Sequence, residues 1–342
     1  MTGKFLYPYG EPVISGLLKS QAEDFKVTEK LGFKPQGEGE HLFLWIEKSG
    51  LTTHELIERV AKDFSVKARD IGHSGLKDKI AVTRQWLSLY LPGQMISLEL
   101  PNISGYKLLD HAWHHKKLRP GTHRSNHFEV IIRNVDTMST TSWQQLDSIR
   151  SKGMANYFGQ QRFGQQDDNV EQALRAFSNA RRARKLSRSK RSLYVSALRS
   201  FLFNCILARR IERGFWYKPL SGDVFMLSGS QSIFFEPIND ALLERYNLFD
   251  LSSTISLYGS GKRLLEDDAL ELEDQVLSKF EDIKHCLIQQ NAKLQMRATR
   301  VAAQELSVNH DASGKSLHIE VTLPRGSYFT SLLNHFIETG NS

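Results

Sequence analysis

One acidic side chain, Asp78, lies between two lysines in "SGLKDKIAVTRQWLSLYLPG", residues 74–93. A cation held near it would favour the ionised carboxylate, which can act as a nucleophile or a base but not as a general acid. Because neighbouring side chains on an extended chain point to opposite faces, such a cation can come from a distant part of the sequence instead of from Lys77 or Lys79. The alternative role is a turn residue that follows Gly75. Local chemistry leaves both roles open.

Histidines gather in "DHAWHHKKLRPGTHRSNH", residues 110–127, and they raise the possibility of a zinc site. The spacing contains no H-E-x-x-H, and the interleaved lysines and arginines would repel a dication. A basic loop that lies on a phosphate backbone explains the same composition better, so we expect no metal. The histidines concerned are His111, His114, His115, His123 and His127. The two cysteines of the chain, Cys205 and Cys286, are expected to be reduced thiols.

No nucleotide-binding motif is present. "GSGK" at 259–262 lacks the remainder of a P-loop, and "GEGEH" at 37–41 does not match G-x-G-x-x-G and carries acids that would repel pyrophosphate. A G-x-S-x-G nucleophile elbow is also missing. We therefore expect the protein to use no cofactor, including no small-molecule cofactor.

Length and charge narrow the class of protein. A chain of 342 residues favours two domains or one domain with a large insertion. The net charge of +7 favours a polyanionic partner such as RNA, DNA or an anionic membrane. Without a run of about 18 apolar residues or a signal-peptide pattern at the start, we expect a cytoplasmic protein that does not enter the membrane. Residues 181–191 are strongly basic, which is typical of RNA contact or of a solvated helix face, whereas residues 266–274 are acidic and are expected to be solvated.

The elements that would position these residues change in type along the chain. Short runs with β character occur at 41–48, 86–93 and 127–135. Residues 52–64 predict a helix, because Leu56, Val60 and Phe64 recur at helical spacing after the capping candidates Thr52 and Thr53. From about 154 to about 302 long amphipathic helical patterns dominate. The alternation of "SLHIEVTLP" at 316–324 then predicts a strand, "RGS" a turn, and "YFTSLLNHFIET" a helix. We infer that the C-terminal part rejoins the N-terminal sheet and that the middle is an insertion.

Five blocks in order make the chain resemble a known family. "GLKDKIAVTRQWLSLYLPG" is similar to the central motif of the TruD family of tRNA pseudouridine synthases, and the other blocks occur in the order of that family's motifs. These are "EDFKVTE" with the following "LGFKPQGEGEHLFLWIEKSGLTT", then "HKKLRPGTHRSNHFEVIIRNV", "MANYFGQQRFG" and "LPRGSYFTSLL". The resemblance implies an α+β fold, a mixed-sheet pseudouridine synthase core built from N- and C-terminal parts, with an inserted α/β TRUD domain. The implied domains are 1–153 and 303–342 for the core and 154–302 for the insertion.

The resemblance also implies roles for particular residues. The catalytic nucleophile falls on Asp78, and the uracil-contacting positions fall on Phe25, Asn126, Phe128 and Tyr328. Tyr328 is often Phe in relatives, so its added hydroxyl leaves its polar contacts open. Without the resemblance, Phe25 and Phe128 would be interpreted as core residues and Asn126 as a turn residue. Lys77 is expected either to support Asp78 or to contact phosphate.

The implied activity is the isomerisation of uridine 13 of tRNA to pseudouridine, with the target base flipped out of its stack. The expected partner is tRNA, and no obligatory protein partner is inferred. The alternative is a non-catalytic RNA-binding protein or RNA chaperone of the same fold. A metal-dependent nuclease is a third possibility, but the sequence contains no convincing carboxylate cluster that would bind its metal ions.

Overall fold

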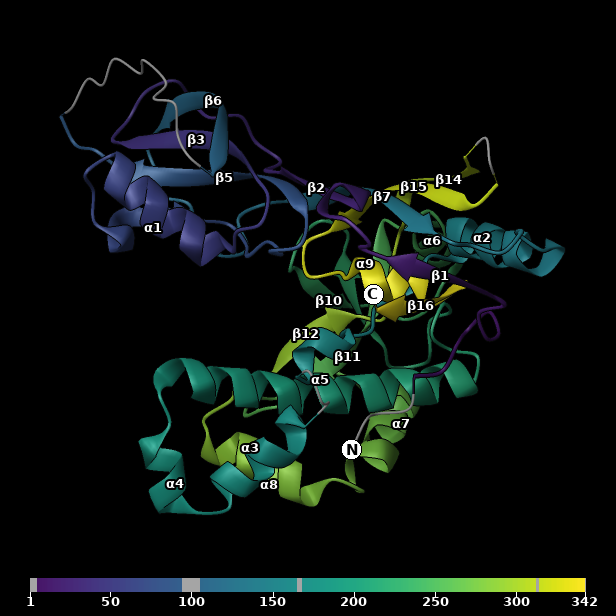
Figure 1. Ribbon diagram of the computed structural model, residues 1–342. Helices are drawn as coiled ribbons and strands as arrows, with labels where there is room; N and C mark the ends of the chain where they lie inside the picture. The colour runs from purple at the N-terminus through teal and green to yellow at the C-terminus, as the bar shows by residue number, and fades with distance from the viewer. Residues whose placement is uncertain (1–4, 94–104, 165–167, 312–313, 342) are drawn as a thin grey trace. The chain divides into compact units, whose positions relative to one another are not determined.

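The computed structural model describes residues 5–93, 105–164, 168–311 and 314–341 (Figure 1). Its contacts divide the chain into two compact units, which we name by their dominant structure. The sheet unit comprises 14–139, 304–326 and 337–342, and the helical unit comprises 1–13, 140–303 and 327–336. Both units are therefore built from segments far apart in the sequence.

The sheet unit contains one large mixed sheet with the order β14-β15-β7-β2-β5-β3-β6; in addition, β1 pairs with β7 and β16, and β4 with β5. Most neighbours are antiparallel, while β2–β5 and β1–β16 are parallel. The strands are β1 (Ile14–Leu18), β2 (Phe25–Lys30), β3 (His41–Lys48), β4 (Ile71–His73), β5 (Val82–Tyr90), β6 (Tyr106–His114), β7 (Ser125–Arg133), β14 (Gln304–His310), β15 (Ser316–Pro324) and β16 (Ile337–Asn341). Short 3-10 helices η1 (Ala22–Asp24) and η2 (Ala68–Asp70) precede β2 and β4. The α+β class with a mixed sheet is confirmed.

One helix, α1 (Thr53–Asp63), covers part of this sheet (Figure 1). Its start follows from a capping box in which Thr52 Oγ1 accepts from the amide of Glu55 and the Glu55 carboxylate accepts from the amide of Thr52. Of the predicted stripe of Leu56, Val60 and Phe64, the first two are fully buried against strand residues of β3 and β5, and Phe64, which follows the helix, is partly buried. The buried face of α1 is thus part of the same hydrophobic core as β3 and β5.

The helical unit is organised around α5 (Arg188–Glu212), which contacts α3, α7, α8 and strand β11 (Figure 1). Its helices are α2 (Thr140–Lys152), α3 (Asn169–Phe177), α4 (Ala180–Lys185), α5, α6 (Asp240–Asn247), α7 (Asp267–Leu277), α8 (Glu281–Gln289) and α9 (Phe329–Leu333), with the 3-10 helix η3 (Gln160–Arg162). A four-stranded sheet has the order β10-β9-β11-β12, and β8 pairs with β13. These strands are β8 (Met154–Ala155), β9 (Val224–Leu227), β10 (Ile233–Phe235), β11 (Leu251–Leu257), β12 (Gln295–Ala298) and β13 (Arg300–Val301).

Two sequence predictions need correction at this level. The helix predicted for 328–339 covers only Phe329–Leu333, and Ile337–Asn341 forms β16 instead, because Ile337 is fully buried in a parallel pairing with β1. The acidic run 266–274 is not wholly solvated, since Glu273 is fully buried in α7 and accepts from the amide of Ser256 at 2.8 Å. Burial raises the pKa of Glu273. Both cysteines are free thiols, as expected.

Candidate active site

Asp78 lies in the loop between β4 and β5, and its side chain is 44% exposed. Its Oδ2 accepts a hydrogen bond from the ammonium of Lys19 at 2.6 Å. Lys19 follows β1 and has a left-handed backbone, with φ of 59°. The cation next to the carboxylate therefore comes from a distant segment, which is the arrangement that strand alternation allowed. An accessible, ion-paired carboxylate is suited to nucleophilic attack.

The two lysines that flank Asp78 in sequence have different partners. Lys77 is buried, and its ammonium donates to Glu29 Oε2 at 2.7 Å, where the Glu29 side chain is fully buried as well. Lys79 pairs with Glu55 at 3.1 Å, and both of these side chains are exposed. The amide of Lys77 donates to Thr53 Oγ1 at 2.8 Å, so the start of α1 also holds this loop. The Lys77 ammonium is therefore paired with Glu29, and the Lys77 amide joins the loop of Asp78 to the start of α1.

An aromatic pair lies beside Lys19. The Phe25 and Phe128 rings meet edge to face at 6.1 Å, and the Lys19 ammonium lies 4.3 Å from the centroid of Phe25. Lys19 therefore connects the carboxylate of Asp78 to the Phe25 ring. Phe25 and Phe128 are 4% and 7% exposed, which means that they also belong to the packed core of the sheet unit.

Asn126 lies near the start of β7, and its Nδ2 is 3.4 Å from His123 Nε2. His123 is itself buried, and burial, with the nearby Lys77 charge, lowers its pKa. A ring that is neutral at pH 7 can accept from the amide at Nε2, which leaves Asn126 Oδ1 as the acceptor of this side chain. That oxygen is buried and has no partner in the structure. Sequence reasoning placed His123 only in a basic loop and missed this contact.

Tyr328 belongs to the helical unit, so its surroundings are described within that unit. Its hydroxyl accepts a hydrogen bond from Arg162 Nη2 at 2.7 Å, and its ring lies 6.3 Å from that of Phe158. The polar contact left open by the sequence is therefore supplied by Arg162 in η3. Asp78, Phe25, Lys77, Asn126 and Phe128 all lie in the sheet unit.

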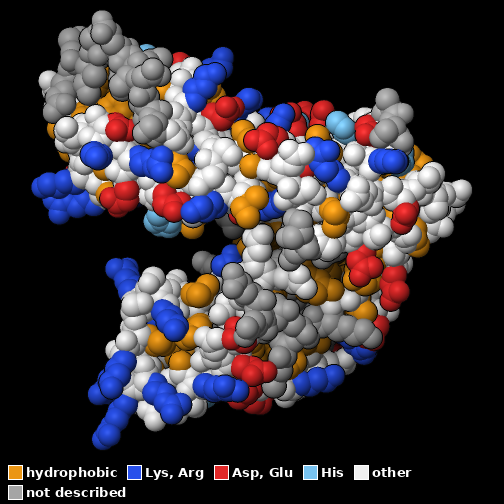
Figure 2. Space-filling view, in the orientation of Figure 1, with side chains coloured by type: hydrophobic (Ala, Val, Ile, Leu, Met, Phe, Trp, Pro, Cys, Tyr) orange, Lys and Arg blue, Asp and Glu red, His pale blue; other side chains and the backbone are white. Residues whose placement is uncertain are grey.

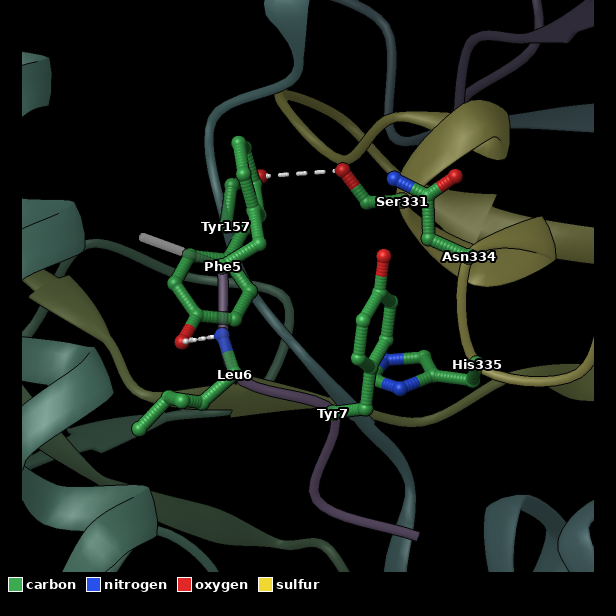
Figure 3. A pocket seen from close by; sticks show the side chains of 7 residues that line it. All are labelled: Phe5, Leu6, Tyr7, Tyr157, Ser331, Asn334 and His335. Atoms are coloured by element: carbon green, nitrogen blue, oxygen red, sulfur yellow. Dashed lines mark hydrogen bonds between the residues drawn. The ribbon is translucent and has the colours of Figure 1, made fainter. Parts of the chain in front are cut away.

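A small cavity of about 10 Å³ in the helical unit has no part in this arrangement (Figure 3). It is lined by Phe5, Leu6, Tyr7, Tyr157, Ser331, Asn334 and His335. His335 Nε2 accepts from the amide of Ala155 at 3.2 Å, and burial lowers the pKa of His335 to about 4. A volume of this size holds about one water molecule, so the cavity is a packing feature and not a base pocket.

Among the residues that the structure describes, no group of three or more His, Cys, Asp and Glu side chains could hold a metal ion. Over the same part of the chain, no helix has the length and apolar character needed to cross a bilayer.

Comparison with known proteins gives a consistent result along the chain. A family model described as tRNA pseudouridine synthase D (TruD) matches residues 1–172 and 166–336. The tRNA pseudouridine synthase D of Colwellia psychrerythraea is 36% identical over 97% of this chain and 92% of that protein. The protein of the same name from Methylococcus capsulatus is 35% identical over 96% of this chain and 93% of that protein.

A solved structure shares the fold of this chain. A crystal structure assigned to tRNA pseudouridine synthase D of Methanosarcina mazei covers 98% of this chain and 96% of its own, with a TM-score of 0.74 and 22% sequence identity. That likeness shows the fold, and the matches above define the class as a pseudouridine synthase, an isomerase. The chain belongs to the tRNA pseudouridine synthase D (TruD) family.

Proposed function

We propose that this protein converts uridine 13 of tRNA to pseudouridine, with Asp78 as the nucleophile. The reaction breaks the bond from the ribose to N1 of uracil and forms a bond from the ribose to C5; C5 loses a proton and N1 gains one, with no redox change. A covalent intermediate on Asp78 divides the rearrangement into easier steps. The observation that carries the proposal is the exposed Asp78 carboxylate, which is ion-paired to Lys19 beside the Phe25 ring.

The target base must leave its stack before the carboxylate can reach it, and extrusion costs a few kcal/mol. Aromatic faces recover about 1–3 kcal/mol per stacked base, and Phe25, Phe128 and Tyr328 are the proposed contacts. Asn126 is proposed to bind a uracil edge through Oδ1, the acceptor that the His123 contact leaves open. Lys77 is proposed to hold the loop of Asp78, since its ammonium is paired with Glu29.

The family suggests how the chain is divided between these tasks. We propose a catalytic core from 1–153 and 303–342 and an inserted TRUD domain from 154–302. The sheet that joins 14–139 with 304–326 and 337–342 supports this division, although the compact units differ from it at their edges. A cytoplasmic location stays a prediction.

Tritium release tests the activity. Unmodified tRNA labelled at C5 of its uridines should lose label to water when the protein is added in EDTA, and mapping should place the product at position 13. Product at another position would support pseudouridine formation but would assign a different target uridine. Binding of tRNA without release would favour a non-catalytic RNA-binding role.

Salt dependence tests the proposed phosphate contacts. Figure 2 shows Lys and Arg side chains gathered around α4 and the start of α5. The residues concerned are Arg181, Arg182, Arg184, Lys185, Arg188, Lys190 and Arg191. The tRNA association constant should fall steeply between low and moderate salt, and Arg181→Gln with Arg184→Gln should reduce the log–log slope by about 2. Lys279→Gln with Lys284→Gln is the charge-matched control, and an equal loss of slope in both double variants would contradict the assignment.

Replacement of Tyr328 separates its ring from its hydroxyl. Tyr328→Ala should lower kcat/KM by about 5- to 150-fold, the equivalent of one lost stack of about 1–3 kcal/mol. Tyr328→Phe keeps the face and loses only the Arg162 contact, so its kcat/KM should stay within about tenfold of wild type. Tyr90→Ala removes an exposed tyrosine of the sheet unit and serves as the control. Equal losses for Phe and Ala would assign the effect to the hydroxyl.

A further inference from the structure

The side chain of a buried lysine, Lys48, contacts the main chain of Asp78. It is the last residue of β3, pairs with Thr83 of β5 and Tyr106 of β6, and is only 1% exposed. Its ammonium donates to the carbonyl of Leu51 at 2.6 Å and to the carbonyl of Asp78. One side chain therefore joins the loop before α1 to the loop that carries Asp78.

The two loops are joined a second time. The amide of Gly50 donates to the carbonyl of Lys79 at 3.1 Å, next to the Lys48 contact. A buried charge is costly unless hydrogen bonds satisfy it, and the hydrogen bonds of Lys48 described by the structure go to main-chain carbonyls, not to a carboxylate. An apolar residue at this position would fill the core as well but would not hold the loop. The Lys48 ammonium thus fixes the relative position of the two loops through its hydrogen bonds to their carbonyls.

We propose that Lys48 is a positioning residue of the reaction, whose buried ammonium fixes the main chain at Asp78 and so directs the carboxylate. This inference rests on the proposed role of Asp78 as nucleophile. Lys48 touches no reacting atom in this scheme. It acts through the backbone, whereas Lys19 acts on the carboxylate itself.

The charge of Lys48 depends on pH. Burial is the main cause that lowers its pKa, to about 8, with Lys77 and Lys19 acting in the same direction and Asp78 and Glu55 in the opposite one. As pH rises through about 8, the ammonium becomes a neutral amine with fewer and weaker donors, so kcat should fall. Between about 8 and the ordinary lysine pKa of 10.5 the unfolded state binds more protons than the folded one, so the contribution of this group to stability increases with pH. Loss of turnover without unfolding is the expected signature.

Variants separate positioning from packing. In Lys48→Met the long apolar stem remains and both hydrogen bonds are lost; kcat should fall by about 10²-fold while KM for tRNA stays within about threefold, because a misplaced reacting group costs rate and not binding. Lys48→Arg keeps a charge that does not titrate in this range, so its kcat should be partly restored and should show no fall near pH 8. Lys62→Met, at an exposed position near the end of α1, is the control.

Three results would overturn the proposal. The first is a kcat of Lys48→Met within about twofold of wild type, and the second is a loss of tRNA affinity in Lys48→Met, measured as a rise in KM, as large as its loss of kcat. The third is a decrease of kcat above about pH 8 in Lys48→Arg that equals the decrease in wild type. If Lys48→Met does not fold, the pH profiles of wild type and Lys48→Arg decide.

If the wild type releases no tritium, the proposed function fails and positioning is tested by hydrogen exchange. The hydrogen-bonded amides of Gly50 and Lys77 should then exchange about tenfold faster in Lys48→Met than in Lys62→Met, and equal rates would reject the role.

Discussion

Asp78→Asn is expected to reduce tritium release from C5-labelled tRNA to less than about a thousandth of the wild-type rate, as is typical when a nucleophile is removed. The amide has nearly the same shape as the carboxylate but cannot serve as an anionic nucleophile. Because the Lys19–Asp78 pair is partly exposed, its loss should change folding stability by no more than about 1 kcal/mol. Affinity for tRNA should remain within a few-fold, since phosphate contacts supply most of it.

Asp136→Asn is a suitable control, because Asp136 is an exposed acid of the same unit. The measurement compares single-turnover tritium release and tRNA binding for wild type and both variants in EDTA. Substantial release by Asp78→Asn would remove Asp78 from the role of nucleophile. Lost binding in the same variant would instead indicate a role in the RNA interface.

Lys77→Met is expected to destabilise the protein by about 3–5 kcal/mol, because it leaves the buried Glu29 carboxylate without its cation. Lys79→Met removes the other lysine next to Asp78, but its pair with Glu55 is exposed, so the expected cost is at most about 1 kcal/mol. Two neighbouring substitutions of the same type should therefore differ several-fold in their effect on the free energy of unfolding.

Urea denaturation followed by circular dichroism measures this difference. Equal midpoints for Lys77→Met and Lys79→Met would contradict the assignment of a buried ion pair. Combining Lys77→Met with Glu29→Leu should restore part of the loss, since an apolar pair of similar volume removes the unpaired charge. The double variant is then expected to fold, but its Asp78 loop lacks the ion pair between Lys77 and Glu29.

Local patterns predicted the elements near the site well. The run "HLFLWIEK" coincides with β3, and the Thr52 cap with the Leu56 and Val60 stripe gives α1, because capping and periodicity are properties of neighbouring residues. The predicted return of the C-terminal part to the sheet is confirmed by β15, which pairs with β7 along its length. The short β16 was missed, because its burial depends on β1 and not on its own pattern.

The supporting charges could not be predicted in the same way. Lys19, Glu29 and Lys48 reach the Asp78 loop across 59, 48 and 30 positions of sequence, respectively. Each of them stands in a segment whose local pattern is that of an ordinary strand or strand end. Motif resemblance nominated Phe25, Asn126, Phe128 and Tyr328, and their roles remain predictions. It gave no indication that Lys48 would be buried against the main chain of Asp78 or that Arg162 would donate to the hydroxyl of Tyr328.

Strand β7, which carries Asn126 and Phe128, is enclosed by β2 on one edge and by β15 on the other. During synthesis on a ribosome, β2 is available early, whereas β15 emerges only after the whole helical segment has been translated. Until then β7 presents an open hydrogen-bonding edge, and such edges promote misassembly of partly made chains. Translation speed across the helical segment and chaperone supply should therefore affect the yield of folded enzyme more than either affects its final stability.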